Sequence, residues 1–209
     1  LYATIGVQAA LFHRQLTGEA TKVDIGMLDC QLALLENAVM RYQVSGTAPG
    51  PLGARHPSIT PFEAYKTKDG YIIISAGNDG LFAKLAEALE NPGWAEDPDY
   101  SSNDNRNKHV EKLKIEMESV LTTHTTSHWI EVLDKFGVPS GPINDIGQAA
   151  THPQTIARNM IVSVDDPITG PMKVAGNPIK ISGFEDPETR EPAPNLDQNR
   201  EQILRELTD

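Results

Sequence analysis

The histidines and the single cysteine are the side chains most able to bind a metal or to act as nucleophiles. His124 and His128 have the i, i+4 spacing of a zinc-binding helix, but no glutamate follows His124 and no third ligand is evident. Cys30 lies between Asp29 and Gln31 without a designated histidine partner, which favours a packed thiol over a nucleophile. The sequence has no G-x-S-x-G, Walker or G-x-G-x-x-G motif. We therefore assign no metal site, and hydrolase, NTPase and dinucleotide-binding functions lack support.

A basic loop at Gly53–Pro57 offers a different kind of chemistry. Arg55 presents forked N–H donors that suit phosphate or carboxylate groups, and His56 stands beside it. The alternative is a surface loop with a His-Pro turn, and on the loop alone the two interpretations have equal weight. A local basic spot can receive an anionic ligand even in an acidic protein.

The Gly77-Asn78-Asp79 run offers a second possible contact for a ligand. Asn78 or Asp79 can cap the helix that is predicted from Leu81 onward, which is a purely structural role. A helix N-terminus preceded by glycine also lets a ligand approach the backbone closely. The two roles are compatible.

The elements that would hold these two loops include a β-hairpin. Phe62 and Tyr65 mark a β-prone run, Asp69-Gly70 supplies a turn with positive φ angles, and 71–74 begins the return strand. Together the basic loop, the hairpin and the Gly-Asn-Asp turn form a compact unit with the features of a ligand holder.

Apolar periodicity predicts further elements on both sides of the hairpin. The expected elements are a helix over 1–16 that ends at Thr17-Gly18, a strand at 23–25, a helix over 27–44, a helix over 105–121, a helix capped by Thr126 that runs through Phe136, strands at 160–164 and 172–174, an edge strand at 177–180, and a final helix over 197–207. Gly137–Ile143 is expected to be a rigid turn, and Trp94 a packing anchor. The pattern predicts an α/β region at 1–50, an α+β domain at 58–182 and a C-terminal arm at 183–209.

Composition limits the possible partners. The chain has 209 residues and a formal net charge of -11, which argues against a general nucleic-acid binder and against docking on an anionic membrane. With Cys30 as the only cysteine no internal disulfide can form, which is consistent with a reducing cytoplasm. An apolar helical pattern begins directly at Leu1 without Met or cap. We interpret it as a helix whose start is missing, so that the chain looks like part of a longer protein.

Taken together, these residues resemble the class III CoA-transferase family, also called the CaiB–BaiF family. The resemblance covers nearly the whole chain, and its strength lies in the order and spacing of many short motifs. These motifs are 9-AALFHR-14, Thr17-Gly18, 23-VDI-25, Leu28-Asp29, Gly53-x-Arg55-His56-Pro57, 61-PFE-63, Asp69-Gly70, Gly77-Asn78-Asp79, Asp97-Pro98, Asn103 with Arg106, 137-GVPxGP-142, 176-GNPIK-180 and 192-PAP-194.

The resemblance implies a large α/β domain of Rossmann-like topology that is split in sequence, only partly present here, and a small α+β domain between its parts. It also implies an interlocked homodimer, with the active site between the large domain of one chain and the small domain of the other. The substrates would be an acyl-CoA thioester and a small carboxylic acid, with no bound cofactor. Arg55 and His56 would then contact CoA, while Asn78 and Asp79 would lie near the acyl end.

Family transferases use an aspartate carboxylate that forms an anhydride and then an aspartyl-CoA thioester. By family spacing this aspartate stands about five positions before Leu1, so we assign no catalytic residue within the chain. Asp24 and Asp29 do not replace it, because Asp24 falls in the predicted strand and Asp29 begins a helix, where a carboxylate favours the helix dipole.

Two departures from the family pattern leave the subfamily open. Glu19-Ala20-Thr21 stands where a Gly-Gln is common, and 195-NLDQN-199 stands where a Gly-x-His-Thr-like run is usual. The glycine-rich loop of formyl-CoA transferases is also missing. An α-methylacyl-CoA racemase of the same family is an alternative, although such racemases carry a glutamate near the position of Asp79. A non-catalytic chain without the nucleophile is a third possibility.

Overall fold

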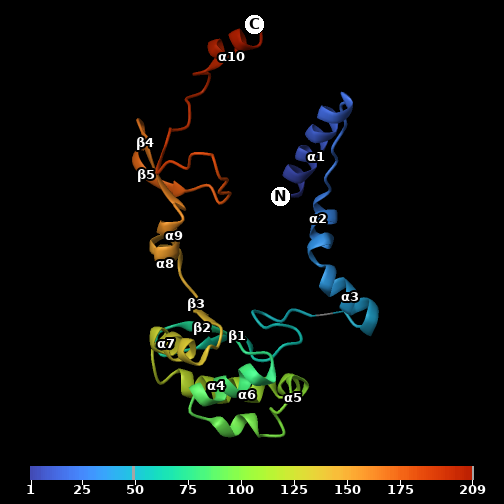
Figure 1. Cartoon of the computed structure of the whole chain (residues 1–209), viewed down its shortest axis with the longest axis vertical. Helices are drawn as coiled ribbons and strands as arrows, with labels where there is room; N and C mark the ends of the chain where they lie inside the picture. Colours follow the sequence, from blue (N-terminus) through green and yellow to red (C-terminus); the bar gives the residue numbers. More distant parts are fainter. Residues whose placement is uncertain (49, 209) are drawn as a thin grey trace. The chain divides into compact units, whose positions relative to one another are not determined.

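The computed structural model describes residues 1–48 and 50–208, and these fall into two compact units. The first unit is Leu1–Pro57 and the second is Ser58–Asp209. Figure 1 identifies the elements of each unit by label and by colour along the sequence.

The first unit consists of helices and loops, and within 1–48 and 50–57 none of its residues is buried. Its helices are α1 (Tyr2–Thr17), α2 (Met27–Leu34) and α3 (Glu36–Ser45). Gly18 ends α1 at a φ of 79°, and its N–H donates to the carbonyl of Arg14, as the Thr17-Gly18 pair predicted. None of the residues of these helices is buried. No described helix in either unit is long and apolar enough to cross a membrane.

Two predictions for the first unit are wrong. The single helix expected over 27–44 is interrupted at Leu35, whose N–H donates to Leu32 instead of continuing the i−4 ladder. Leu35 has a φ of -95° and a ψ of 18°, so the backbone leaves the helical region at a residue that carries no breaker signal. The strand expected at 23–25 does not form, because the described residues provide no strand to pair with it.

The second unit opens with a three-stranded antiparallel sheet in the order β1-β2-β3. Its strands are β1 (Phe62–Lys66), β2 (Tyr71–Ser75) and β3 (Ser140–Pro142). The predicted hairpin is confirmed, with Ala64 opposite Ile73 in its register. The turn is wider than a primed two-residue turn: Thr67 N–H donates to the Gly70 carbonyl, and neither Asp69 nor Gly70 has a positive φ. The segment 137–143, expected to be only a turn, contributes β3 as the third strand.

Helices cover this first sheet. They are α4 (Asp79–Ala88), the 3-10 helix η1 (Pro92–Ala95), α5 (Asn103–Lys108), α6 (Val110–Leu121) and α7 (Thr126–Phe136). The helix predicted over 105–121 is wrong as a single element, because His109 adopts a φ of -110° and separates α5 from α6. Thr125, one residue before the predicted cap, accepts the N–H of His128 and caps α7.

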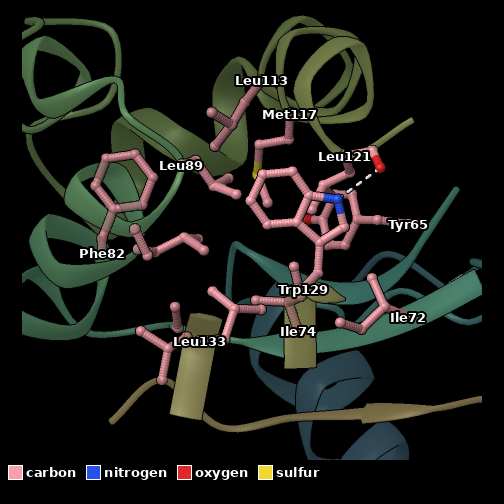
Figure 2. Packing of buried hydrophobic residues seen from close by; sticks show 14 of the residues in the cluster. Tyr65, Ile72, Ile74, Phe82, Leu89, Leu113, Met117, Leu121, Trp129 and Leu133 are labelled. Atoms are coloured by element: carbon pink, nitrogen blue, oxygen red, sulfur yellow. Dashed lines mark hydrogen bonds between the residues drawn. The ribbon is translucent and has the colours of Figure 1, made fainter. Parts of the chain in front are cut away.

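The hydrophobic core lies between this sheet and its helices. Figure 2 shows Trp129 at its centre, among Met117, Leu121 and Tyr65. The indole Nε1 donates to the Leu121 carbonyl at 2.7 Å, so that the one polar atom of the ring is satisfied inside the core. Trp94 packs against the same cluster from η1, as predicted.

The remaining elements form a second small sheet and short helices. They are α8 (Ile146–Thr151), α9 (Pro153–Ala157), β4 (Ile161–Asp166), β5 (Gly170–Ala175), β6 (Thr189–Arg190) and α10 (Arg200–Glu206). The sheet order is β5-β4-β6, with β5 antiparallel and β6 parallel to β4. The edge strand predicted at 177–180 is absent there; β6 occupies the position beside β4. The boundaries predicted at 1–50, 58–182 and 183–209 remain a prediction.

Candidate functional site

A groove of about 600 Å³ opens in the second unit where β1, β2, α4 and α5 begin or end. Its apolar lining comes from Ile59, Phe62, Leu81 and Pro139, while its polar lining comes from Ser75, Asn78, Asp79 and Asn103. An apolar wall with a few convergent polar groups is the usual character of a small-molecule site. Both residues of the predicted acyl-end pair are therefore lining residues of one groove.

The two polar atoms of the Asn78 side chain have different environments. Its Oδ1 accepts the N–H of Leu81 at 2.8 Å, which makes it the N-cap of α4 as the sequence predicted. Its Nδ2 has no hydrogen-bond partner among the described residues and remains able to donate to a bound molecule. A carbonyl or carboxylate oxygen in the groove is the chemical complement of this donor.

Asp79 is held in place by an arginine. Its Oδ1 accepts from Nη2 of Arg106 at 2.9 Å. The aspartate side chain is 66% exposed, whereas that of the arginine is fully buried. The pair therefore connects the interior of the unit with the rim of the groove, and one oxygen of the Asp79 carboxylate is already engaged.

Arg106 uses every nitrogen of its guanidinium group. Nε donates to the Thr60 carbonyl at 2.8 Å and Nη1 to the Tyr100 carbonyl at 2.9 Å. Nη2 donates to the Gly77 carbonyl at 3.1 Å in addition to its bond with Asp79. The guanidinium carbon lies 4.6 Å from the centre of the Phe82 ring, which adds a cation–π contact. A buried charge is tolerated here because four of its five N–H donors are hydrogen-bonded, one of them to a carboxylate.

Two asparagines on the same face of α5 hold the segment that precedes β1. Asn103 accepts the Thr60 N–H at 3.1 Å and donates to the Ser58 carbonyl at 2.8 Å. Asn107 accepts from the Thr60 hydroxyl at 2.7 Å and donates to the same Ser58 carbonyl at 2.9 Å. With Arg106 they form what we call the α5 clamp, namely Asn103, Arg106 and Asn107.

Gly77 lies in the turn before α4. The segment that precedes β1 passes so close to this turn that a side chain at position 77 would not fit. A Cβ atom on Gly77 would lie 2.0 Å from Cγ2 of Ile59, which is far inside van der Waals contact. The absence of a side chain lets the Ile59 side chain form part of the groove wall. The close neighbour of Gly77 is thus the Ile59 side chain, while the approach of a ligand to this turn remains a prediction.

Arg55 and His56 lie in the first unit, just before its end at Pro57. Both are half-buried, and the Arg55 N–H donates to the Leu52 carbonyl across a turn in which Gly53 has a φ of 63°. The structure thus places them in a tight loop, whereas Asn78 and Asp79 lie at the helix end of the second unit. Their predicted contact with CoA remains a prediction.

The turn of the hairpin is occupied by a structural contact. Asp69 Oδ1 accepts both the N–H and the hydroxyl of Thr126, at 2.8 and 3.0 Å. The Thr126 backbone N–H is the main cause that lowers the pKa of the Asp69 carboxyl. The turn is therefore fixed against the start of α7.

The two histidines with the spacing of a zinc-binding helix belong to a cluster of aromatic rings. His124 and His128 stack their rings at 4.3 Å, with Trp129 edge-on to both. No group of three or more His, Cys, Asp or Glu side chains within 1–48 and 50–208 is arranged to hold a metal ion. Cys30 is a half-buried free thiol.

Arg106 is the residue that the sequence reasoning missed as part of a site. It stands in the polar run Asn103-Asp104-Asn105-Arg106-Asn107, which reads as a solvated helix start. Asn103 with Arg106 is one of the motifs that resemble the family, and Asn103, Arg106 and Asn107 stand at positions i, i+3 and i+4, which share a helix face. Nothing in that spacing indicates that the face is turned inward.

Comparison with known proteins defines the class to which this fold and site belong. Residues 1–200 match the family described as CoA-transferase family III. The chain therefore belongs to CoA-transferase family III, as the sequence resemblance predicted.

Three relatives illustrate the similarity. The chain is 38% identical over 202 residues to an acetyl-CoA:oxalate CoA-transferase of Acetobacter aceti, covering 97% of the chain and 51% of that protein. It is 31% identical over 207 residues to the human succinyl-CoA:glutarate CoA-transferase, covering 99% of the chain and 47% of that protein. The crystal structure of a CaiB/BaiF family protein from Brucella suis matches with a TM-score of 0.80 and 32% identity, covering 99% of the chain and 53% of that structure. The chain thus spans about half the length of these relatives.

Proposed function

We propose that the full-length protein transfers CoA from an acyl-CoA donor to a carboxylic acid acceptor, and that the groove at Asn78 and Asp79 receives the acyl end of the thioester. Membership of CoA-transferase family III and the activities for which the relatives are named support the reaction class. The single observation that supports the place is the groove, in which an apolar wall meets the Asn78 amide donor beside an anchored carboxylate.

The reaction that the family resemblance implies requires no cofactor. An aspartate carboxylate that precedes Leu1 attacks the donor thioester carbonyl, giving a mixed anhydride and releasing CoA thiolate. The thiolate then attacks the aspartyl carbonyl of the anhydride, which forms the enzyme thioester and releases the donor acid. The acceptor carboxylate attacks that thioester, and the same two steps in reverse order give acceptor-CoA and the free aspartate. Two acyl transfers thus replace one difficult exchange.

The residues of this chain would serve binding in that reaction. Apolar contacts from Ile59, Phe62 and Leu81 would exclude water from the acyl group, and the Asn78 Nδ2 would donate to an oxygen atom of the substrate. Arg55 and His56 would contact the anionic part of CoA, because a guanidinium group pairs well with phosphate. We place this enzyme in the cytoplasm as an interlocked homodimer in which residues 1–50 belong to the large domain.

The racemase alternative gains nothing from the geometry at Asp79. An acid/base residue needs a carboxylate free to take a proton from the carbon next to the thioester. The Oδ1 of Asp79 is occupied by the Arg106 guanidinium, which suits an anchor better than a base.

The test uses the full-length protein with two donor and acceptor pairs, acetyl-CoA with oxalate and succinyl-CoA with glutarate. Mass spectrometry should detect the acceptor-CoA product, and an acceptor labelled with ¹⁸O in its carboxylate should leave one ¹⁸O atom on the nucleophilic aspartate. Alanine in place of that upstream aspartate should abolish both signals. Exchange of the α-proton of a 2-methylacyl-CoA in D₂O without any CoA transfer would overturn the proposal in favour of the racemase.

A further inference from the structure

We propose that Arg106 is a positioning residue, which sets the place of Asn78 and Asp79 at the groove without touching the substrate. The proposal rests on the proposed function, because it concerns the same groove. It assigns a functional consequence to a fully buried side chain that the sequence analysis named only as part of a family motif, without a role in a site.

Arg106 joins the separate segments that build the groove. Its donors reach Thr60, next to the lining residue Ile59, and Gly77, next to the lining residue Asn78. A third donor reaches Tyr100 in the loop that leads into α5, where Asn103 lines the groove. One guanidinium group therefore fixes the relative position of the segments that carry the groove wall.

The Arg106–Asp79 bond directly restrains the polar rim of the groove, which Asn78 and Asp79 form. Asp79 follows Asn78 at the start of α4 and is exposed, so little else restrains its carboxylate. Gly77 precedes the same asparagine, and its carbonyl accepts from the same Nη2 atom. The residues on both sides of Asn78 are thus bound to one nitrogen, which limits how far its free Nδ2 can move.

Position 106 needs an arginine because all three nitrogens of the guanidinium group donate hydrogen bonds. A lysine keeps the positive charge but carries a single nitrogen, so it cannot reproduce three nitrogens aimed at Thr60, Tyr100 and the Gly77–Asp79 pair. Hydrogen bonds to charged groups are stronger than those between neutral groups, and buried carbonyls left unpaired cost further free energy. Arg106→Lys therefore keeps the positive charge but loses the arrangement of the three nitrogens, so its effect reports on the geometry of the hydrogen bonds.

The experiment measures steady-state kinetics of the full-length protein and its Arg106→Lys and Asp79→Ala variants, with Arg158→Lys as the matched control. Arg158 is an exposed arginine after α9 and lies outside the groove. We expect Arg106→Lys to raise the KM for acyl-CoA by about ten-fold or more, with a smaller change in kcat. Asp79→Ala should raise the same KM to a lesser extent, because the contacts of Arg106 with Thr60, Tyr100 and Gly77 remain. The double variant should show less than the sum of the two effects in free energy, since Asp79 acts through Arg106.

A purely structural role predicts a different result. It would lower the amount of active enzyme, and hence kcat, in step with the melting temperature while KM stayed unchanged, and this result would overturn the proposal. If Arg106→Lys does not fold, Asp79→Ala still decides, because an unchanged KM in that variant contradicts a restrained rim.

A second measurement separates this proposal from the proposed function. Hydrogen exchange of the full-length protein should become faster in peptides over 58–61 and 77–82 in Arg106→Lys, and remain unchanged over 161–175. Failure of the wild-type protein to transfer CoA would refute the proposed function alone. Unchanged exchange at 77–82 would refute the positioning role even in an active enzyme.

Discussion

The second unit contains two three-stranded sheets that are stabilised in different ways. The β1-β2-β3 sheet buries Tyr65, Ile72 and Ile74 beneath its helices, each at most 1% exposed. In the β5-β4-β6 sheet, the strands contribute one buried hydrophobic side chain, Val162, among the described residues. The region around this second sheet is stabilised instead by ion pairs of Asp186 with Lys180 and Arg190.

The difference shows why the groove belongs to the first sheet. A binding wall must hold its side chains in fixed places, and close packing does this better than half-buried ion pairs between flexible side chains. The groove residues Phe62 and Ser75 lie at the paired ends of β1 and β2, directly on the packed sheet. The second sheet has no comparable support from a core.

The largest effect that tests this comparison is expected from the same truncation in each sheet. Ile74→Ala in β2 removes a fully buried side chain and should lower the free energy of unfolding by about 2–5 kcal/mol. Ile161→Ala in β4 removes a half-buried side chain, and we expect less than about 2 kcal/mol. Hydrogen exchange at the strand amides measures each sheet separately. Equal losses in the two sheets would contradict the comparison.

A smaller loss of stability is expected from glycine-to-alanine substitutions at Gly77, which follows β2 of the first sheet, and at Gly176, which follows β5 of the second sheet. A Cβ on Gly77 would clash with the Ile59 side chain, whereas a Cβ on Gly176 would lie 2.3 Å from the backbone oxygen of Asn159. Overpacking of this kind costs about 1–3 kcal/mol. Ile59→Ala should restore stability to Gly77→Ala, because the obstacle is then removed. No side-chain truncation at position 159 should rescue Gly176→Ala.

Thermal unfolding of the single and double variants checks this prediction, with Gly93→Ala as the control. A Cβ on Gly93 would meet no heavy atom within 4 Å, so its melting temperature should stay close to that of the wild type. A Gly77→Ala variant as stable as Gly93→Ala would show that the turn can move away from Ile59.

The sequence was informative where structure is decided locally. The hairpin followed from two β-prone runs and an Asp-Gly turn, and the cap at Asn78 followed from its place before an apolar helix. The strand β3 was missed because Ser140-Gly141-Pro142 has little β propensity and is strand only through pairing with β2. The breaks at Leu35 and His109 were missed because neither is a glycine or proline.

The candidate site was predictable only in part, because some of its features are local in the sequence and others depend on contacts between distant segments. Asn78 and Asp79 stood out because a cap and a glycine are local signals. The burial of Arg106 depends on Thr60, Tyr100 and Gly77, which approach it only after the unit has folded. Tyr100 likewise shows no local sign of its environment, yet burial, with a further contribution from Glu116, raises the pKa of its hydroxyl to about 12.

The smallest effect is expected from acid at the second sheet. Lys180 first and Arg190 second lower the pKa of the Asp186 carboxyl from 3.8 to about 2. A carboxyl whose pKa is lower in the folded state stabilises that state above its unfolded pKa, and this stabilisation is lost as the pH falls through the folded value. Asp186→Asn should therefore be less stable than the wild type above pH 3.8, and the difference should disappear as the pH approaches about 2.

Hydrogen exchange measured across this pH range can confine the effect to one sheet. Amides of β4 and β6 should lose protection in Asp186→Asn, because Arg190, the partner of Asp186, lies in β6 and β6 pairs with β4. Amides of β1 and β2 should not change, since burial of Tyr65, Ile72 and Ile74 does not depend on this charge. Asp165→Asn is the matched control, because Asp165 is exposed on β4 and forms no ion pair within the described residues. A loss of protection in β1 and β2 of the Asp186→Asn variant would mean that the two sheets unfold together, and the contrast between a packed wall and a charge-held sheet would then fail.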